Sequence, residues 1–141
     1  MTKTQVKITT KTELEKPSQV KPFIRWAGGK QNLVRKLSEK VITQNVNNYY
    51  EPFLGAGSLF FFNNFKTGQL SDINPHLINA YSWIKESAEL VSDRLNFHRA
   101  NLTKEYYYKL REQFNSEKDK FSVDQAAIFI FLVHTSFNGI Y

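Results

Sequence analysis

A pair of glycines between two carboxylates is the part of this sequence with the clearest capacity for chemistry. Gly55 and Gly57 form a Gly-x-Gly run directly after a stretch typical of a β-strand, and Asp72 follows the next such stretch. In parallel α/β folds, ligands bind beyond the carboxyl ends of the strands, where glycines permit sharp turns and close approach. A carboxylate at the end of the neighbouring strand can accept hydrogen bonds from both hydroxyls of a ribose. The spacing therefore predicts a site for a nucleoside cofactor, with an ordinary strand-to-helix turn as the alternative.

Two residues near this turn favour a positively charged nucleoside cofactor over a dinucleotide. Phe60 stands where the dinucleotide motif Gly-x-Gly-x-x-Gly has its third glycine, which allows close helix–strand packing around a pyrophosphate. Glu51 lies just before the turn, where its carboxylate would repel a pyrophosphate and attract an amino or sulfonium group. S-adenosylmethionine has both a nucleoside and a positive charge. We therefore expect this cofactor and disfavour a nucleotide-binding oxidoreductase domain.

Trp26 and Lys30 flank a short Ala-Gly-Gly turn and are candidates for the same site. The indole could cover one face of the cofactor, and the ammonium group could pair with a carboxylate such as that of methionine. Each residue also has a purely structural interpretation, the tryptophan as a core side chain and the lysine as a solvated residue at the start of a helix.

These candidates need a scaffold in which helices and strands alternate. Apolar periodicity and turn residues predict strands over residues 47–53 and 69–73, and helices over residues 31–41, 58 to about 68, 75–85, 88–99, 103–114 and 123–135. Ser58 is expected to cap the helix that it begins, and Pro75 is expected in the first turn of the next one. The last helix is apolar on all sides, so we expect it to be buried on several sides.

The alternation of helices and strands predicts an α/β fold with a parallel sheet flanked by helices and right-handed crossovers. Only two strands are evident in the sequence, and a doubly wound sheet needs more. We therefore expect an incomplete sheet followed by a helical block.

Composition narrows the class of protein. The chain has 141 residues, of which 41% are hydrophobic and 15% aromatic, which is enough to form an ordered globular domain. The sequence has no cysteine, which excludes disulfides and thiolate chemistry, and its three histidines are too dispersed to suggest a metal site. The sequence has no apolar run long enough for a membrane span, so we expect an intracellular, cytoplasmic protein.

The net charge and the N-terminal segment give weaker indications of partners and of domain organisation. A formal net charge of +6 favours polyanionic partners such as nucleic acid. Residues 1–20 are polar and lack periodicity, so they are predicted to be a flexible leader.

Four short motifs together resemble the Dam-type, or D12 class, DNA adenine-N6 methyltransferases. The segments are FIRWAGGK at residues 23–30, EPFLGAGS at 51–58, SDIN at 71–74 and SFNGIY at 136–141. They occur in the order found in that family, and the resemblance spans residues 21–141. It implies a Rossmann-like methyltransferase fold dependent on S-adenosylmethionine, of which residues 21–87 would form the N-terminal part. Residues 88–141 would begin a helical domain that recognises the DNA target.

The resemblance also implies roles for individual residues. Those expected to bind S-adenosylmethionine are Trp26, Lys30, Glu51, Phe53, Gly55, Gly57 and Asp72. Phe137 and Asn138 match the start of the target-recognition region, where an aromatic residue and an asparagine meet double-stranded DNA. From the residues alone, this Phe-Asn-Gly run can equally be a helix end with a glycine stop.

One family motif is missing from the 141 residues. The resemblance implies methyl transfer to the N6 amine of an adenine flipped out of the duplex, with an Asp-Pro-Pro-Tyr motif that accepts the hydrogens of the amine. The only prolines are Pro17, Pro22, Pro52 and Pro75, so this motif is absent. The chain is therefore expected to be the first half of such an enzyme and inactive alone. The remaining half as a separate chain, and a non-catalytic module that binds S-adenosylmethionine or DNA, are the alternatives.

Overall fold

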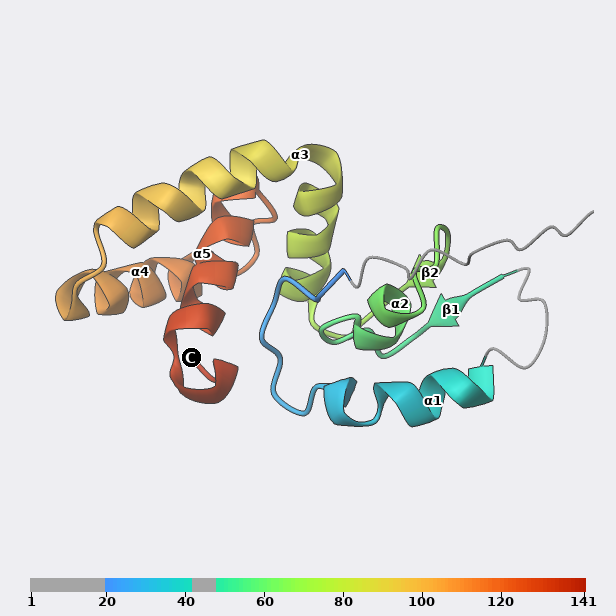
Figure 1. Ribbon diagram of the computed structural model, residues 1–141. Coiled ribbons are helices and arrows are strands. Elements are labelled where there is room, and N and C mark those ends of the chain that lie inside the picture. The colour runs from blue at the N-terminus through green and yellow to red at the C-terminus, as the bar shows by residue number, and fades with distance from the viewer. Residues whose placement is uncertain (1–19, 42–47) are drawn as a thin grey trace, which may run out of the picture.

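The computed structural model describes residues 20–41 and 48–141 (Figure 1). The predicted leader, apart from Val20, lies outside the described residues, and so does the first residue of the predicted strand 47–53. In chain order, a short 3-10 helix and α1 are followed by a small sheet with α2, and then by three longer helices.

The sheet consists of two short parallel strands, β1 (Tyr50–Glu51) and β2 (Gln69–Leu70). Tyr50 is paired with Gln69 and Glu51 with Leu70. Parallel pairing agrees with the sequence analysis, but the strands are shorter than predicted. The chain between them contains α2 (Ser58–Phe62), which also ends earlier than expected. Before the sheet, the 3-10 helix η1 (Lys30–Asn32) leads into α1 (Val34–Val41), and α1 packs against α2.

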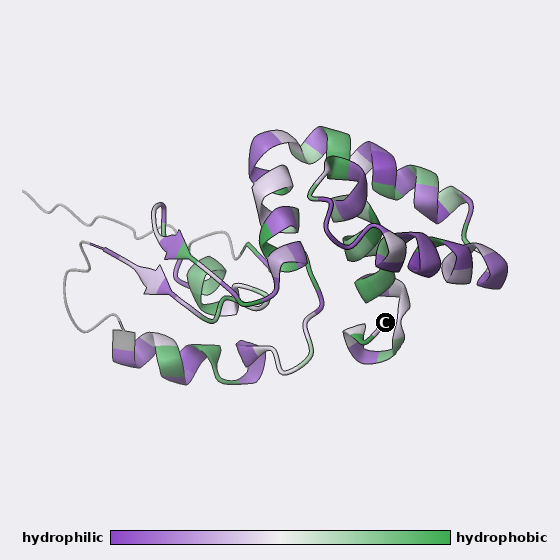
Figure 2. Cartoon of the chain, turned by 180° about the vertical axis from the view of Figure 1, so that it is seen from behind, coloured by the Kyte–Doolittle hydropathy of each residue, from purple (hydrophilic) through white to green (hydrophobic). Residues whose placement is uncertain are grey.

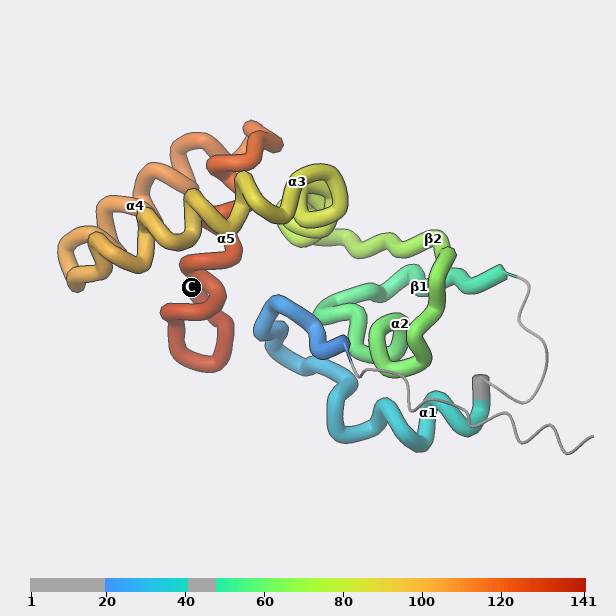
Figure 3. Tube along the Cα trace, turned by 45° about the horizontal axis from the view of Figure 1, so that its top comes forward, coloured from blue at the N-terminus to red at the C-terminus, as the bar shows by residue number. Residues whose placement is uncertain are grey.

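Helix α3 (Pro75–Ala100) is long and sharply bent. Its first turn is capped by Asn74, whose side-chain oxygen accepts hydrogen bonds from the backbone N–H groups of His76 and Leu77. At Ser87 the backbone is not helical (φ −155°, ψ 85°), and the two halves of the helix run in different directions (Figure 3). The two helices predicted at 75–85 and 88–99 are therefore the two halves of α3.

Helix α5 (Val123–Thr135) forms the centre of the helical block. Every residue from 125 to 133 is buried, as the apolar sequence predicts, because α5 packs against α3 and against α4 (Lys104–Ser116). The hydrophobic α5 contrasts with the mainly hydrophilic α4 in Figure 2. Thr103 caps α4 and Ser122 caps α5 through their side-chain oxygens, and the short helix η2 (Phe137–Gly139) follows α5.

The expectation that Ser58 caps α2 is wrong. Gly57 occupies the capping position with φ +65°, a conformation that glycine adopts without steric cost, and no side chain caps the helix. Ser58 is instead the first helical residue, and its buried Oγ has no hydrogen-bond partner. The glycine turn that ends the loop therefore also begins the helix.

The described part of the chain is thus mostly helical, with a small parallel sheet of two strands. None of the helices found in residues 20–41 and 48–141 has the length and apolar character needed to cross a membrane.

Candidate functional site

The loop after β1 is shaped by its glycines. Gly55 and Gly57 have φ values of +52° and +65°, which other residues rarely adopt. Leu54 between them and β1 is almost completely buried, and its N–H donates to the carbonyl of Ser71 after β2 (2.9 Å). The buried leucine and the two left-handed glycines together keep the loop backbone close to the end of the sheet.

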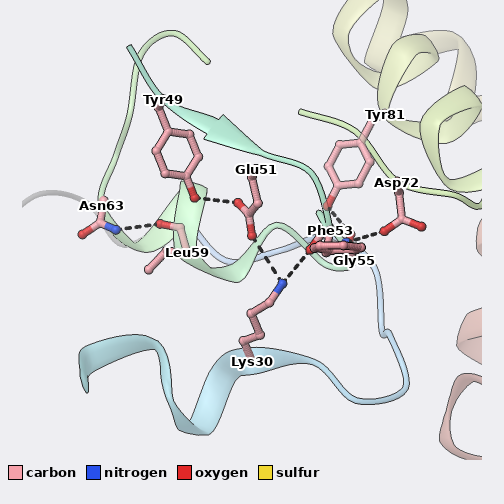
Figure 4. Close-up of polar contacts among 9 residues, drawn as sticks. All are labelled: Lys30, Tyr49, Glu51, Phe53, Gly55, Leu59, Asn63, Asp72 and Tyr81. Carbon is pink, nitrogen blue, oxygen red and sulfur yellow. Dashed lines mark hydrogen bonds and ion pairs between the residues drawn. The ribbon is translucent and has the colours of Figure 1, made fainter. Parts of the chain in front are cut away.

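Asp72 connects the ends of the two strands. Its Oδ2 accepts a hydrogen bond from the N–H of Gly55 (2.9 Å), and its Oδ1 accepts one from the N–H of Asn74 (3.0 Å). Figure 4 shows the carboxylate beside the glycine loop. The carboxylate therefore already holds two backbone groups, and its remaining lone pairs are available to a ligand.

Trp26, which lies in the segment before η1, packs against the glycine loop. A Cβ atom added to Gly55 would lie 3.0 Å from Cδ1 of Trp26, so the indole needs a residue without a side chain there. On the core side, the Trp26 ring packs against Phe129 of α5, with centroids 6.1 Å apart. The N–H of Gly29 donates to the carbonyl of Trp26 (3.0 Å), which closes the turn that leads to Lys30.

These segments enclose a cavity of about 160 Å³. The residues that line it are Trp26, Ala27, Gly28, Gly29, Lys30, Phe53, Leu54, Gly55, Ala56, Ser58 and Asp72. Five of the residues predicted to bind cofactor are therefore brought together, although they come from three separate stretches of sequence. Gly57 and Glu51 are not part of the lining, and each lies behind it.

Glu51 contacts Lys30, which lines the cavity, although Glu51 itself does not. The Glu51 side chain is buried (8% exposed), and its Oε1 lies 3.5 Å from Nζ of Lys30. The same Nζ donates a short hydrogen bond of 2.6 Å to the carbonyl of Phe53 (Figure 4). An ammonium group has three N–H donors, so one remains for a ligand in the cavity.

Two tyrosines that the sequence analysis did not select, the buried Tyr49 and the partly buried Tyr81, support this site. The hydroxyl of Tyr49 donates to Oε2 of Glu51 (2.8 Å), and the hydroxyl of Tyr81 donates to the carbonyl of Gly55 (3.4 Å). Burial raises the pKa of both phenols above the usual value, with a further contribution from the negative charge of Glu51, so both keep the proton that they donate. Tyr49 lies two residues before Glu51, so the period of a strand could have indicated that the two side chains share a face.

Ser58 is a further residue of the cavity wall that the sequence analysis interpreted differently. Because it caps nothing, its buried hydroxyl is an unpaired polar group next to the space in which a ligand would lie.

Phe137 and Asn138, the residues expected to meet DNA, lie outside this cavity. Both are exposed, Phe137 to 85%, and Asn138 has a left-handed backbone (φ 52°) within η2. The end of α5 is nevertheless close to the segment that carries Trp26, since Nε2 of His134 donates to the carbonyl of Phe23 (2.8 Å). The alternative interpretation, a glycine stop at the end of the buried helix, is wrong for α5, which ends at Thr135 with Ser136 as its C-cap. Gly139, with φ +75°, is instead the last residue of η2.

A second cavity, of about 450 Å³, adjoins the first one. It shares Trp26, Gly29 and Ala56 with the first cavity, and His134 at the end of α5 is also part of its wall. The two cavities therefore share part of one wall.

Comparison with known proteins gives concordant matches. The profile of the D12 class N6 adenine-specific DNA methyltransferases matches residues 26–141. The type II methyltransferase M.MjaIII of Methanocaldococcus jannaschii is 35% identical over 139 residues, which cover 87% of this chain and 48% of that protein. The DNA adenine methylase of Haemophilus influenzae is 35% identical over 133 residues, which cover 92% of this chain and 46% of the methylase. The type II methyltransferase M1.LlaDCHI of Lactococcus lactis is 34% identical, with 86% and 43% covered. The chain thus spans less than half the length of these relatives.

Proposed function

Because this chain belongs to the D12 class of N6 adenine-specific DNA methyltransferases, we propose that its glycine-loop cavity binds S-adenosylmethionine for methylation of adenine in DNA. The observation that carries the proposal is the convergence of Trp26, Lys30, Phe53, Gly55 and Asp72 on one cavity. No dinucleotide is needed to account for this set of side chains.

Two charged side chains of the cavity, those of Asp72 and Lys30, suit polar groups of the cofactor. The Asp72 carboxylate has free lone pairs for the ribose hydroxyls beyond those given to Gly55 and Asn74. The free N–H of the Lys30 ammonium group suits the carboxylate of the methionine portion. Trp26 and Phe53 offer apolar surface, and Phe53 is 75% exposed at the rim. Glu51 would act on the cofactor through Lys30 rather than by direct contact.

We also assign the two halves of the described chain to two tasks. Residues 21–87 would form part of a Rossmann-like cofactor domain, and residues 88–141 would begin a helical domain for target recognition. The interruption of α3 at Ser87 supports a boundary there, since the helix changes direction at that residue. The exposed side chains of Phe137 and Asn138 would contact double-stranded DNA near the second cavity.

Binding and methyl transfer are separate expectations for the 141 residues. The sequence contains no Asp-Pro-Pro-Tyr segment, which the family resemblance gives as the group that binds the amine of the target adenine. By itself, the 141-residue protein is therefore expected to bind cofactor without transferring its methyl group. An additional chain segment with that motif would supply the amine site.

Titration calorimetry with S-adenosylmethionine and with NAD tests the proposal. We expect binding of S-adenosylmethionine, and Lys30→Met should weaken it by about tenfold or more through loss of a charge-assisted hydrogen bond. Lys36→Met, on the exposed surface of α1, removes an equal charge and should leave the affinity unchanged. Tighter binding of NAD, or equal effects of the two lysine variants, would overturn the proposal.

A further inference from the structure

The ring of Tyr49 is held in a fixed position just before β1. It is buried (8% exposed) and stacks on Phe65 with ring centroids 4.2 Å apart. From the neighbouring chain segment just before β2, a Cβ atom added to Gly68 would lie 3.1 Å from Cδ1 of Tyr49. With close neighbours on these sides, the ring has little freedom to move.

The hydroxyl of this fixed ring determines where the Glu51 carboxylate points. The hydroxyl donates to Oε2 at 2.8 Å, and the bond is buried. Because Tyr49 stays protonated, as its raised pKa indicates, it acts as a donor throughout the physiological pH range. The other carboxylate oxygen, Oε1, is thereby directed to Nζ of Lys30 (Figure 4).

Lys30 is in turn the only one of these three residues that lines the cavity. Its Nζ lies between Oε1 of Glu51 (3.5 Å) and the carbonyl of Phe53 (2.6 Å). The ammonium group sits on a flexible stem, so its position depends on the acceptors around it.

We propose that Tyr49 is a positioning residue for ligand binding, which acts through Glu51 to aim the Lys30 ammonium group at the amino-acid portion of the cofactor. This inference rests on the proposed function. Without the phenol, the Glu51 carboxylate can rotate. The carbonyl of Phe53 then remains as the acceptor that holds Nζ of Lys30, and one acceptor does not fix the direction of the free N–H. The adenosine portion of the cofactor, which does not depend on Lys30, is unaffected.

A matched pair of ligands separates this role from a structural one. S-adenosylhomocysteine and 5′-methylthioadenosine share the adenosine and the thioether, but only the first carries the amino-acid portion. Tyr49→Phe should weaken binding of S-adenosylhomocysteine by about fivefold to tenfold, less than the loss of a direct hydrogen bond to a charged group, because Tyr49 acts only through Glu51 and Lys30. Binding of 5′-methylthioadenosine should change by less than about twofold. Tyr50→Phe removes the hydroxyl of the adjacent, exposed tyrosine and should alter neither affinity.

The combination with Glu51→Gln identifies the path of the effect. If Tyr49 acts through the charge of Glu51, Glu51→Gln alone should reproduce the selective loss for S-adenosylhomocysteine, and adding Tyr49→Phe should bring little further loss. The same single variant tests the inference if Tyr49→Phe does not fold, which thermal unfolding would reveal.

Each outcome of this experiment either supports or overturns the positioning role of Tyr49. Equal weakening of both ligands in Tyr49→Phe, or no weakening of either, overturns the positioning role while leaving the proposed function intact. Additive losses in the double variant also overturn it. If the unmodified chain binds neither ligand, the proposed function itself is overturned, and the positioning role with it.

Discussion

The Asp72 carboxylate can be tested for two separate tasks with one substitution. In Asp72→Ala, the N–H groups of Gly55 and Asn74 lose the acceptors that lie 2.9 Å and 3.0 Å away in the structure. These bonds join the loop after β1 to the start of α3. Their loss should therefore be visible without any ligand, as reduced stability of the fold.

The size of this effect follows from the two bonds. A hydrogen bond to a charged acceptor contributes about 1.5–3 kcal/mol when it is well shielded. Asp72 is only partly buried, and water can replace part of what is lost. We therefore expect the free energy of unfolding to fall by about 2–3 kcal/mol in total, below the sum for two fully shielded bonds. Urea denaturation followed by circular dichroism measures this change.

The second task of Asp72 is measured on the same protein by calorimetry. If the carboxylate also accepts the ribose hydroxyls, Asp72→Ala should weaken S-adenosylmethionine binding by about tenfold or more. Asp93→Ala, on an exposed turn of α3, is the matched control and should affect neither measurement. Unchanged stability would refute the role in the loop, and an unchanged dissociation constant in the folded variant would refute the ribose role.

Three further predictions concern the helix start, pH and catalysis. Ser58→Ala should leave the stability unchanged or slightly raised, because the buried hydroxyl has no partner, whereas Ser122→Ala removes a true cap and should cost about 1 kcal/mol in urea denaturation. Burial lowers the pKa of His98 and of His76, so the unfolded chain takes up protons at a higher pH than the folded one. The stability of the fold should therefore be constant above the ordinary histidine pKa of about 6.5 and fall as the pH drops below it. A pH-independent unfolding midpoint between pH 7 and 5 would contradict this. The purified 141-residue protein should transfer no tritiated methyl group to duplex DNA, and incorporation above background would show that the amine site does not need Asp-Pro-Pro-Tyr.

Local features of the structure were predictable where they depend on neighbouring residues. The N-cap at Asn74 and the position of Pro75 in the first turn of α3 follow from the residue types alone. The burial of α5 follows from its apolar sequence. The two separate helices predicted over residues 75–85 and 88–99 correspond to the two halves of α3 on either side of Ser87. The lengths of the two strands were overestimated. A strand ends where pairing with its partner ends, and the sequence of one strand alone does not show where that is.

Ser58 illustrates the limit of reading a cap from residue type. A serine before an apolar run favours an N-cap, but the helix begins at the residue after a capping glycine, and Gly57 takes that place because the loop needs a positive φ there. Packing gives a second reason for glycine at this position, since a side chain at Gly57 would meet Phe61 and Tyr81 at 3.0 Å.

The sequence by itself determined the family and supplied the candidate residues of the site, because the motifs are short and contiguous. Only the tertiary structure decided how these residues relate to one another. It separated Glu51 and Gly57 from the cavity wall, gave Asp72 two backbone partners, and revealed Tyr49 behind Glu51. The physical reason is that hydrogen-bond partners and burial depend on contacts between distant segments. The glycine pair predicts a loop that can approach a ligand, whereas the segments packed around that loop determine which atoms a ligand can reach.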